Sequence, residues 1–328
     1  MNKNESPHRP LSDDVLYSII KQSQFNQYPE QEHTDFIAAY AQFNQLNPEQ
    51  IGVANGSDEW IQKCMMTLGT GDIMTLNPDF VMYTTYACQL GRKVHYIDCD
   101  ATFQFDIDLI IAEIKLKKPD LFILSQPNNP TGQLMSDAFI QALSDAMKAI
   151  NGYLILDEAY IEFSRSYTVP QGAHIIQMRT LSKAYGFAGL RIGVVIADSN
   201  VLARLNSVAH PYPVNALSLQ IATAFIKDTK AIQAFIATQL QLTTRLKSIL
   251  YKQRDIIEVM DSETNFVLTY GENAVSLGTF IQKHGFQIRT YPDIPILKDT
   301  VRYSITTEEQ LNQFEQLIHE WRVQNDFN

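Results

Sequence analysis

Between about residues 51 and 197, short apolar runs alternate with longer stretches in which apolar residues recur at helical spacing. Turn residues bound each run, and continuous apolar character is typical of a strand covered on both faces. The stretches between the runs suit the crossover connections that parallel strands require. The pattern predicts an α/β domain with a mainly parallel sheet. Its expected strands are 73–76, 94–97, 121–124, 153–156, 175–178 and 192–196.

After residue 216 the pattern changes and predicts a smaller α+β domain. Its expected elements are a long helical stretch from Leu217 to about Lys252, strands at 266–268 and 301–305, and a last helix from about Glu308. We expect residues 28–216 to form the large domain, and residues 1–27 with 217–328 to form an N-terminal arm and the small domain. No Gly/Ser-rich linker separates the halves, so they are expected to pack tightly.

The composition of the chain excludes several classes of function. The 328 residues are 45% hydrophobic, which is enough to bury a large core, and the net charge of -10 argues against nucleic-acid binding. The three cysteines form no CxxC pair and indicate a reducing compartment. The start of the chain is polar, and no run approaches eighteen apolar residues. We therefore expect a cytoplasmic protein that acts on a small solute and neither enters a membrane nor holds a metal.

Four motifs follow predicted strands, where ligand sites form in open α/β sheets. Residues 55–59, Asn-Gly-Ser-Asp-Glu, come directly after a run that ends at Val53. They begin a helix whose free N–H groups can bind an anion such as a phosphate. Taken alone, this motif favours a plain helix cap. Residues 127–132, Pro-Asn-Asn-Pro-Thr-Gly, form a polar turn, which alone is consistent with a simple loop.

The third motif, Leu-Asp-Glu-Ala-Tyr at 156–160, places Asp157 at the end of an apolar strand. A buried carboxylate needs a partner, which a protonated heteroaromatic nitrogen would supply, although a capping Asp is the alternative. The fourth motif runs from Thr180 to Gly186 and continues through Gly189-Leu190-Arg191. There Lys183 leaves a strand into a Gly-rich turn, where lost solvation lowers the pKa of an amine and makes it a nucleophile.

Together the four motifs require a cofactor with a phosphate, an aromatic nitrogen, an acceptor oxygen and a carbonyl. Pyridoxal 5'-phosphate (PLP) carries all four groups. A nicotinamide cofactor fits less well, because Gly186, Gly189 and Gly193 are not spaced as G-x-G-x-x-G and no lysine chemistry would be needed.

With these motifs, the sequence resembles the fold-type-I PLP-dependent aminotransferases, and within them the histidinol-phosphate aminotransferase family along nearly its whole length. The resemblance is carried by PNNPTG, DEAYIEF, TLSKAYGFAGLR and PYPVN, which occur in this order. It implies the aspartate aminotransferase-like fold of PLP-dependent transferases, with a large domain containing the mainly parallel sheet and a smaller α+β domain.

The resemblance also implies roles for individual residues. Lys183 would form the Schiff base with PLP, and Asp157 would pair with the ring nitrogen. Asn129 and Tyr160 would bind the ring oxygen, and Phe80 would stack on the ring where the family usually has Tyr. The phosphate would be contacted by Ser57, Asp58, Ser182 and Arg191.

Three further residues concern the substrate and a neighbouring subunit. Arg302 would bind the substrate α-carboxylate, which suits a planar fork of donors. Arg289 would contact the distal end of the substrate, although residues 291–295 beside it differ from the usual family pattern. Tyr28 would reach the cofactor phosphate of the neighbouring subunit, which implies a homodimer with shared active sites.

One segment departs from the family. Residues 2–7 resemble the family's N-x-N-E-x-P segment, so the arm that usually precedes it is expected to be absent. In relatives that arm helps to close over the substrate.

The expected activity is transfer of an amino group from an amino donor to a keto acid, with histidinol phosphate and 2-oxoglutarate as the first hypothesis. Lys183 would move the proton, with Asp157 and Tyr160 supporting the cofactor. Three alternatives remain open: an aromatic-amino-acid aminotransferase, a PLP decarboxylase resembling threonine-phosphate decarboxylase, and a non-catalytic PLP-binding regulatory protein.

Overall fold

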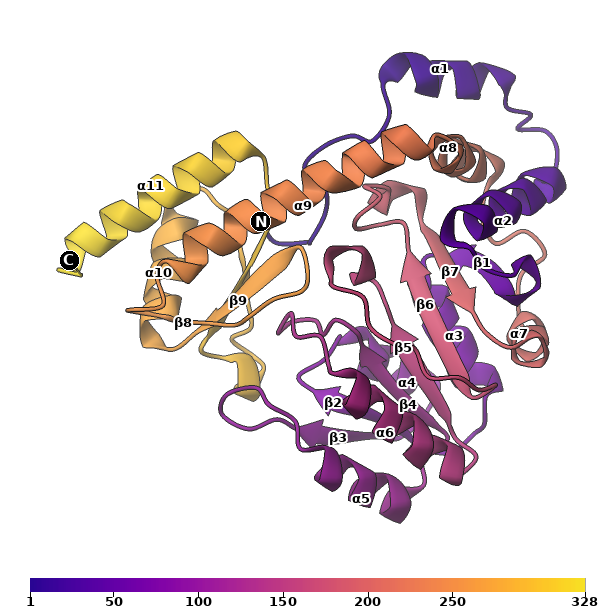
Figure 1. Ribbon diagram of the computed structural model, residues 1–328, viewed down its shortest axis with the longest axis horizontal. Helices are drawn as coiled ribbons and strands as arrows, with labels where there is room; N and C mark the ends of the chain where they lie inside the picture. Colours follow the sequence, from indigo (N-terminus) through magenta and orange to yellow (C-terminus); the bar gives the residue numbers. More distant parts are fainter. Residues whose placement is uncertain (328) are drawn as a thin grey trace.

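The computed structural model describes residues 1–327, so Asn328, the last residue of the expected small domain, lies outside the described part. Two sheets organise residues 1–327: a seven-stranded large sheet and a four-stranded small sheet. Figure 1 shows each sheet in its own lobe, with the long helix α9 (Thr229–Tyr251) running from one lobe to the other. This arrangement confirms the expected fold class.

The large sheet is mainly parallel, as predicted. Only β7 runs antiparallel to both of its neighbours within the described chain. Side by side, the strands are β1 (Ile51–Asn55), β7 (Ile192–Ile196), β6 (Ile175–Thr180), β5 (Tyr153–Asp157), β4 (Leu121–Ser125), β2 (Ile73–Asn77) and β3 (Val94–Asp98). All six runs expected to be strands are found, and β1 adds an edge strand before the first motif.

Helices cover both faces of the large sheet because side chains alternate along each strand. On β5, Ile155 points to one face, whereas Leu154 and Leu156 point to the other. The first face is covered by α3 (Ser57–Thr67), α4 (Met82–Gln89) and α7 (Ser199–Asn206). The second is covered by α5 (Ile107–Lys117), α6 (Asp137–Ala149), α2 (Glu30–Asn44) and α8 (Ala216–Lys227).

The small sheet is antiparallel and carries its own core. In spatial order its strands are β10 (Arg289–Thr290), β11 (Thr300–Ser304), β9 (Phe266–Tyr270) and β8 (Glu258–Val259). Its core is shared with α9, α10 (Glu272–Lys283) and α11 (Glu308–Gln324). The patterns at 266–268 and 301–305 predict β9 and β11. The two-residue strands β8 and β10 are too short to show a periodic pattern.

The stretch expected to be one long helix from Leu217 to about Lys252 is two helices, so that expectation is wrong as a continuous element. Asp228 breaks it, with φ -87° and ψ 80°, and its carboxylate accepts a hydrogen bond from the N–H of Ala231 at 3.0 Å. Asp is a preferred N-cap, so the same residue ends α8 and begins α9. The break lets α8 pack on α2 while α9 reaches the small sheet.

The N-terminal region touches both lobes. Helix α1 (Asp13–Gln22) packs against α8, whereas the carbonyl of Met1 accepts a hydrogen bond from Ser304 of β11. Short 3₁₀ helices complete the connections: η1 (Pro48–Gln50), η2 (Ile161–Phe163), η3 (Ala188–Leu190) and η4 (Pro295–Leu297). The domain boundaries at residues 27 and 216 stay a prediction.

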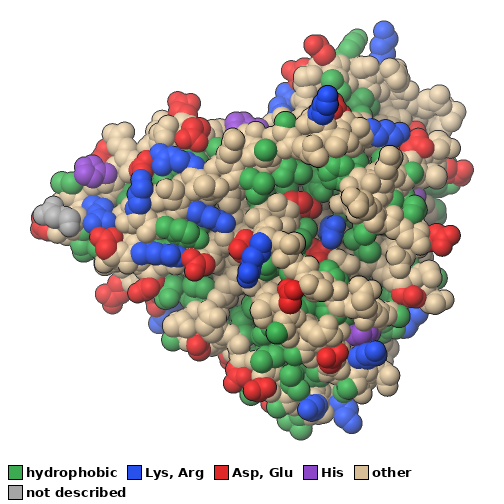
Figure 2. All heavy atoms as spheres, in the orientation of Figure 1, with side chains coloured by type: hydrophobic (Ala, Val, Ile, Leu, Met, Phe, Trp, Pro, Cys, Tyr) green, Lys and Arg blue, Asp and Glu red, His purple; other side chains and the backbone are tan. Residues whose placement is uncertain are grey.

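The surface in Figure 2 carries interspersed acidic and basic side chains, with no single-sign field on the face shown. In the described chain, no helix is both long and apolar enough to cross a bilayer.

The N-terminus of α3 lies directly against β7. A Cβ added to Gly193 would lie 2.2 Å from the carbonyl carbon of Gly56 and 2.3 Å from the backbone nitrogen of Ser57. Both atoms belong to backbone, so neither can rotate away. The absence of a side chain at Gly193 therefore sets the position of the first residues of α3, which follow the carboxyl end of β1.

We predict that Gly193→Ala lowers the free energy of unfolding by about 1–3 kcal/mol, because the added methyl group separates α3 from β7. The measurement is urea unfolding followed by circular dichroism. The matched control is Gly189→Ala, since nothing lies within 4 Å of a Cβ there, and its effect should stay within about 0.5 kcal/mol. Equal stability of the two variants would contradict the close approach.

Candidate active site

Two adjoining cavities lie where the strands of the large sheet end. The inner cavity has a volume of about 110 Å³ and the outer one about 300 Å³. Every predicted cofactor residue except Tyr28 lines the inner cavity, and both predicted substrate arginines line the outer one. The two share Phe80, Asn129, Tyr160 and Lys183, so they form one continuous site.

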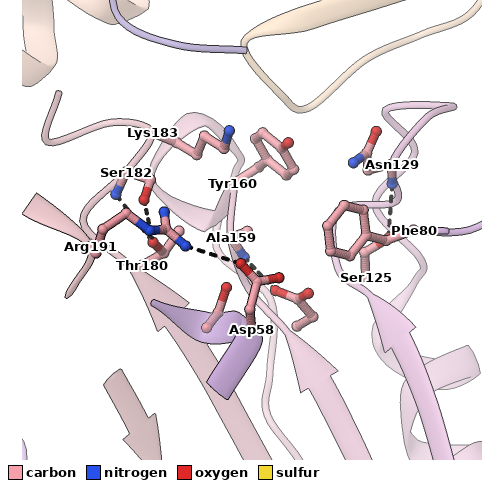
Figure 3. A pocket seen from close by; sticks show the side chains of 12 residues that line it. Asp58, Phe80, Ser125, Asn129, Ala159, Tyr160, Thr180, Ser182, Lys183 and Arg191 are labelled. Carbon is pink, nitrogen blue, oxygen red and sulfur yellow. Dashed lines mark hydrogen bonds and ion pairs between the residues drawn. The ribbon is translucent and has the colours of Figure 1, made fainter. Parts of the chain in front are cut away.

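One end of the inner cavity is built to bind an anion. The helix α3 begins at Ser57 after Gly56, which has φ 78°, and its first N–H groups are unpaired within the helix. Arg191, with φ 54°, donates from Nη2 to the carboxylate of Asp58 at 3.0 Å (Figure 3). A Cβ on Gly56 would lie 2.6 Å from this Nη2, so glycine leaves room for the guanidinium.

The Asp58 side chain is thus an acceptor paired with Arg191 rather than a donor to an anion. A phosphate there would be held by the backbone N–H groups of the α3 N-terminus and by the guanidinium. Ser182 completes this end: its hydroxyl accepts a hydrogen bond from Thr180 at 2.9 Å, which leaves its own proton available.

Asp157 lies in the wall of the cavity at the end of β5 and is only 3% exposed. Its carboxylate accepts hydrogen bonds from the hydroxyl of Tyr83 at 2.8 Å and from the N–H of Ala159 at 3.2 Å. Burial raises the pKa of Asp157 to about 6, and the two hydrogen bonds act in the opposite direction. Both donors are neutral, so the site favours a cationic group against this carboxylate.

Lys183 lines the same cavity and lies next to Tyr160 (Figure 3). Its Nζ is 5.9 Å from the centre of the Tyr160 ring and donates to the carbonyl of Lys3 at 3.1 Å. Burial lowers the pKa of Lys183 to about 8, and the nearby Arg302 guanidinium lowers it further in the same direction. The amine therefore gives up its proton far more readily than an exposed lysine does.

Asn129 is held so that its amide N–H₂ group is free to donate. Its backbone N–H donates to the hydroxyl of Ser125 at 2.8 Å, and its side-chain oxygen accepts from Nη1 of Arg302 at 2.5 Å. The Ser125 hydroxyl in turn donates to the half-buried carboxyl group of Asp79, and desolvation raises the pKa of Asp79 to about 8. In Figure 3, Asn129 and Phe80 lie across the cavity from Lys183.

Phe80 and Tyr160 bring aromatic surface to the cavity. Phe80 meets the ring of Tyr83 edge-on, with 5.5 Å between ring centres, which fixes its orientation. The hydroxyl of Tyr160 accepts a hydrogen bond from the amide of Asn4 at 2.8 Å, and burial raises its pKa.

Arg302 is 7% exposed and lies on β11, where it forms a register pair with Arg289 of β10. Its Nη2 donates to the carbonyl of Asn2 at 2.8 Å, and its guanidinium carbon lies 4.9 Å from the centre of the Phe266 ring. Its Nε has no hydrogen-bond partner among the described residues. Arg289 is exposed to solvent. The two arginines therefore offer an anionic substrate one buried cation, Arg302, and one solvent-exposed cation, Arg289.

Tyr28 lies apart from both cavities. It is 76% exposed and stacks on Tyr212, with 4.5 Å between ring centres. Its predicted role concerns the site of another subunit, so its place in this chain neither supports nor contradicts that role.

The structure adds residues that the sequence analysis did not assign, namely Tyr83, Asp79, Ser125, Thr180 and Asn4. Tyr83 and Asp79 lie in the segment that contains Phe80, and Ser125 and Thr180 end the strands β4 and β6. The position of these four residues next to the motifs in the sequence could have identified them as part of the site. Asn4 is about 300 residues away from its partner Ser304 in sequence, and only folding brings them together.

These residues fit PLP on observations of this structure alone. The anion end suits a phosphate, the buried Asp157 suits a protonated ring nitrogen, and Asn129 and Tyr160 can bind a ring oxygen. The lowered pKa of Lys183 suits a covalent bond between its amine and a carbonyl carbon.

Comparison with known proteins identifies the family of the chain. The profile of the family "Aminotransferase class I and II" matches residues 2–318. The chain is 34% identical to a histidinol-phosphate aminotransferase of Clostridium novyi (strain NT), over 92% of this chain and 85% of that protein.

Two solved structures share the fold. The histidinol-phosphate aminotransferase of Clostridium acetobutylicum has a TM-score of 0.87 at 22% identity and covers 99% of this chain and 98% of its own. That of Sinorhizobium meliloti, in complex with pyridoxal-5'-phosphate, has a TM-score of 0.83 at 22% identity and covers 98% of this chain and 89% of its own.

Fold and site together define a PLP-dependent transaminase, which acts on an amino donor and a keto acid. The chain belongs to the aminotransferase class I and II family, which confirms the resemblance inferred from its motifs.

We predict that, without PLP, Lys183→Met is more stable than the parent protein at pH 7. A pKa of about 8 corresponds to a cost of roughly 3 kcal/mol for holding the amine charged in the folded chain. Between pH 8 and about 10.5 the folded parent loses this proton before the unfolded chain does, so parent stability rises and the difference shrinks. Urea unfolding from pH 7 to pH 10 measures it. A difference independent of pH would contradict the lowered pKa.

Proposed function

We propose that this chain transfers the amino group of histidinol phosphate to 2-oxoglutarate. The observation that carries the proposal is the enclosed guanidinium of Arg302, which lies beside Lys183 in the continuous site and has a free N–H at Nε. The name of the relative with 34% identity supports the choice of amino donor.

The two substrates carry different anionic groups, which must bind at the same position in this site. 2-Oxoglutarate, like the glutamate formed from it, carries an α-carboxylate, whereas histidinol phosphate carries a phosphate ester on the carbon next to its amino-bearing carbon. A single anion site must therefore accept both groups. Arg302 suits this task, because a guanidinium fork binds carboxylate and phosphate alike. Arg289, at the open rim, can reach the distal carboxylate of glutamate.

When bound, PLP would supply an electron-withdrawing ring for the electrons of the substrate Cα atom. Asp157 keeps a proton on the ring nitrogen, because a cation there satisfies the buried carboxylate. Asn129 and Tyr160 hold the ring oxygen, and Phe80 packs against the ring face. Lys183, once its amine is free and neutral, accepts the proton of the substrate Cα atom and can deliver it to a neighbouring carbon.

The donor is tested by mixing the PLP-loaded protein with histidinol phosphate, glutamate, phenylalanine or tyrosine and following the absorbance of the bound cofactor. We predict rapid change with the first two and slow change with the aromatic amino acids. Lys183→Ala should slow the reaction by more than about 10²-fold, because the proton acceptor is removed.

A clear preference for phenylalanine or tyrosine would contradict this donor and favour an aromatic-amino-acid aminotransferase. Release of CO₂ in place of a keto product would favour a decarboxylase. Cofactor binding with no response to any donor would favour a regulatory protein.

We further propose that the active unit is a homodimer in which Tyr28 reaches the cofactor phosphate of the neighbouring subunit. The high exposure of Tyr28 supports this role, as do the exposed apolar side chains Tyr17 and Phe25 in the same N-terminal region. We also propose that the protein is cytoplasmic and that its domains divide at residues 27 and 216.

A mixed dimer tests the shared site. Tyr28→Ala and Lys183→Ala should each lack normal activity, the first because PLP binds about tenfold more weakly. A dimer of one subunit of each kind should regain one normal site, because Lys183 of one subunit meets Tyr28 of the other. Leu116→Ala, at a 68% exposed apolar side chain on α5 outside the N-terminal region, is the control and should bind PLP normally. No recovery in the mixed dimer, or a monomer in sedimentation, would contradict the proposal.

A further inference from the structure

The N-terminal segment crosses the mouth of the site, and Asn4 is its buried residue. Asn4 is 2% exposed, whereas Lys3 and Glu5 on either side are exposed. Its backbone is left-handed, with φ 56°, a conformation that Asn tolerates better than most residues. This local conformation turns the Asn4 side chain inward while its neighbours face solvent.

Every polar group of Asn4 is hydrogen-bonded. Its N–H donates to the hydroxyl of Ser304 at 3.2 Å, and its carbonyl accepts from the amide of Asn265 at 3.1 Å. Its side-chain oxygen accepts from the Ser304 hydroxyl at 2.5 Å, and its side-chain nitrogen donates to the Tyr160 hydroxyl at 2.8 Å. Asn4 thereby links the small-sheet lobe to an aromatic residue of the inner cavity.

The pattern of donors fixes the direction of these bonds. The hydroxyl of Ser304 accepts from the Asn4 N–H, so its own proton is free to go to the Asn4 side-chain oxygen. The side-chain nitrogen must then face Tyr160, where it can only donate. Because this donor occupies one side of the phenol oxygen, the phenol proton points elsewhere. Tyr160 lines the inner cavity, whereas Asn4 does not, so the cavity offers a place for an acceptor of that proton.

We propose that Asn4 is a positioning residue that orients the Tyr160 phenol to donate its proton toward the ring oxygen of the cofactor. The inference rests on the proposed PLP site. Asn4 itself acts through Tyr160 and need not touch the cofactor. The Ser304 hydroxyl supports the orientation by holding the amide of Asn4.

The electrostatic surroundings of Tyr160 come from several elements. Arg302 of β11 favours a negative phenol oxygen, as does the Asn4 bond, whereas Asp157 of β5 opposes it. The amine of Lys183 and the phenol of Tyr291 also face this group. A change at Asn4 leaves these groups in place, so its effect can be separated from theirs.

The test uses Asn4→Gly in the PLP-loaded protein, because glycine accepts a positive φ and adds no charge. A phenol that donates to the ring oxygen stabilises the form in which that oxygen is negative, so it lowers the pH midpoint of the cofactor's absorbance change. Asn4→Gly should raise this midpoint by up to about one pH unit and lower kcat/KM about 3- to 10-fold, as expected for one lost hydrogen bond. Ser304→Ala should act in the same direction with a smaller effect.

The decisive comparison repeats both changes in a Tyr160→Phe background. If Asn4 acts through the phenol, neither change shifts the midpoint further there. A full additional shift would show a general structural effect and overturn the proposal. Unfolding of the cofactor-free proteins measures the structural cost separately, and Ser6→Ala, in the same segment, should leave both the midpoint and kcat/KM unchanged.

Failure of this inference is distinct from failure of the proposed function. If the parent protein shows no cofactor absorbance or no amino transfer, the proposed site itself is wrong. If the parent is active but Asn4→Gly keeps the parent midpoint, only the role of Asn4 is wrong.

Discussion

The burial of the Asp157 carboxylate is the constraint on which this site depends. The strand β5 carries it below the surface, and its hydrogen-bond donors in the described chain, Tyr83 and Ala159, are both neutral. These hydrogen bonds do not offset the full free-energy cost of burying the negative charge of Asp157, as its raised pKa shows. In the proposed site, a protonated ring nitrogen would remove that cost and would itself be kept protonated in return. One contact would then stabilise the carboxylate and help the cofactor to withdraw electrons.

Lys183 poses the opposite problem in the same cavity. A proton acceptor needs a neutral amine, and burial together with the neighbouring Arg302 and Arg191 favours the neutral form by lowering the pKa of Lys183 to about 8. In the proposed site these same cations also bind anions. The two arginines would then serve two purposes with the same charges: they would hold anionic groups and make the lysine amine a better proton acceptor.

Much of this arrangement could be predicted from the sequence because it depends on local patterns. Apolar runs predict the strands, and the motifs that end them meet at one edge of a parallel sheet, so Asp157, Lys183 and Asn129 were found together. The break at Asp228 was missed because one residue interrupts two helical patterns of the same period. The contacts of Asn4 and Arg302 were also beyond reach, since partners about 170 to 300 residues apart leave no periodic signal.

Those long-range contacts explain how the two lobes act as one site. Arg302 comes from the small sheet, yet its nitrogens bind the Asn129 oxygen of the large-sheet lobe and the carbonyl of Asn2. Both acceptors are neutral, whereas a substrate brings a carboxylate or phosphate, which forms stronger charge-assisted bonds with a guanidinium. The free protein therefore holds Arg302 in place with partners that an anion can outcompete. Asn4 lies two residues after Asn2 in the same N-terminal segment and donates a hydrogen bond to Tyr160. A shift of Asn2 on substrate binding would therefore be felt at Tyr160.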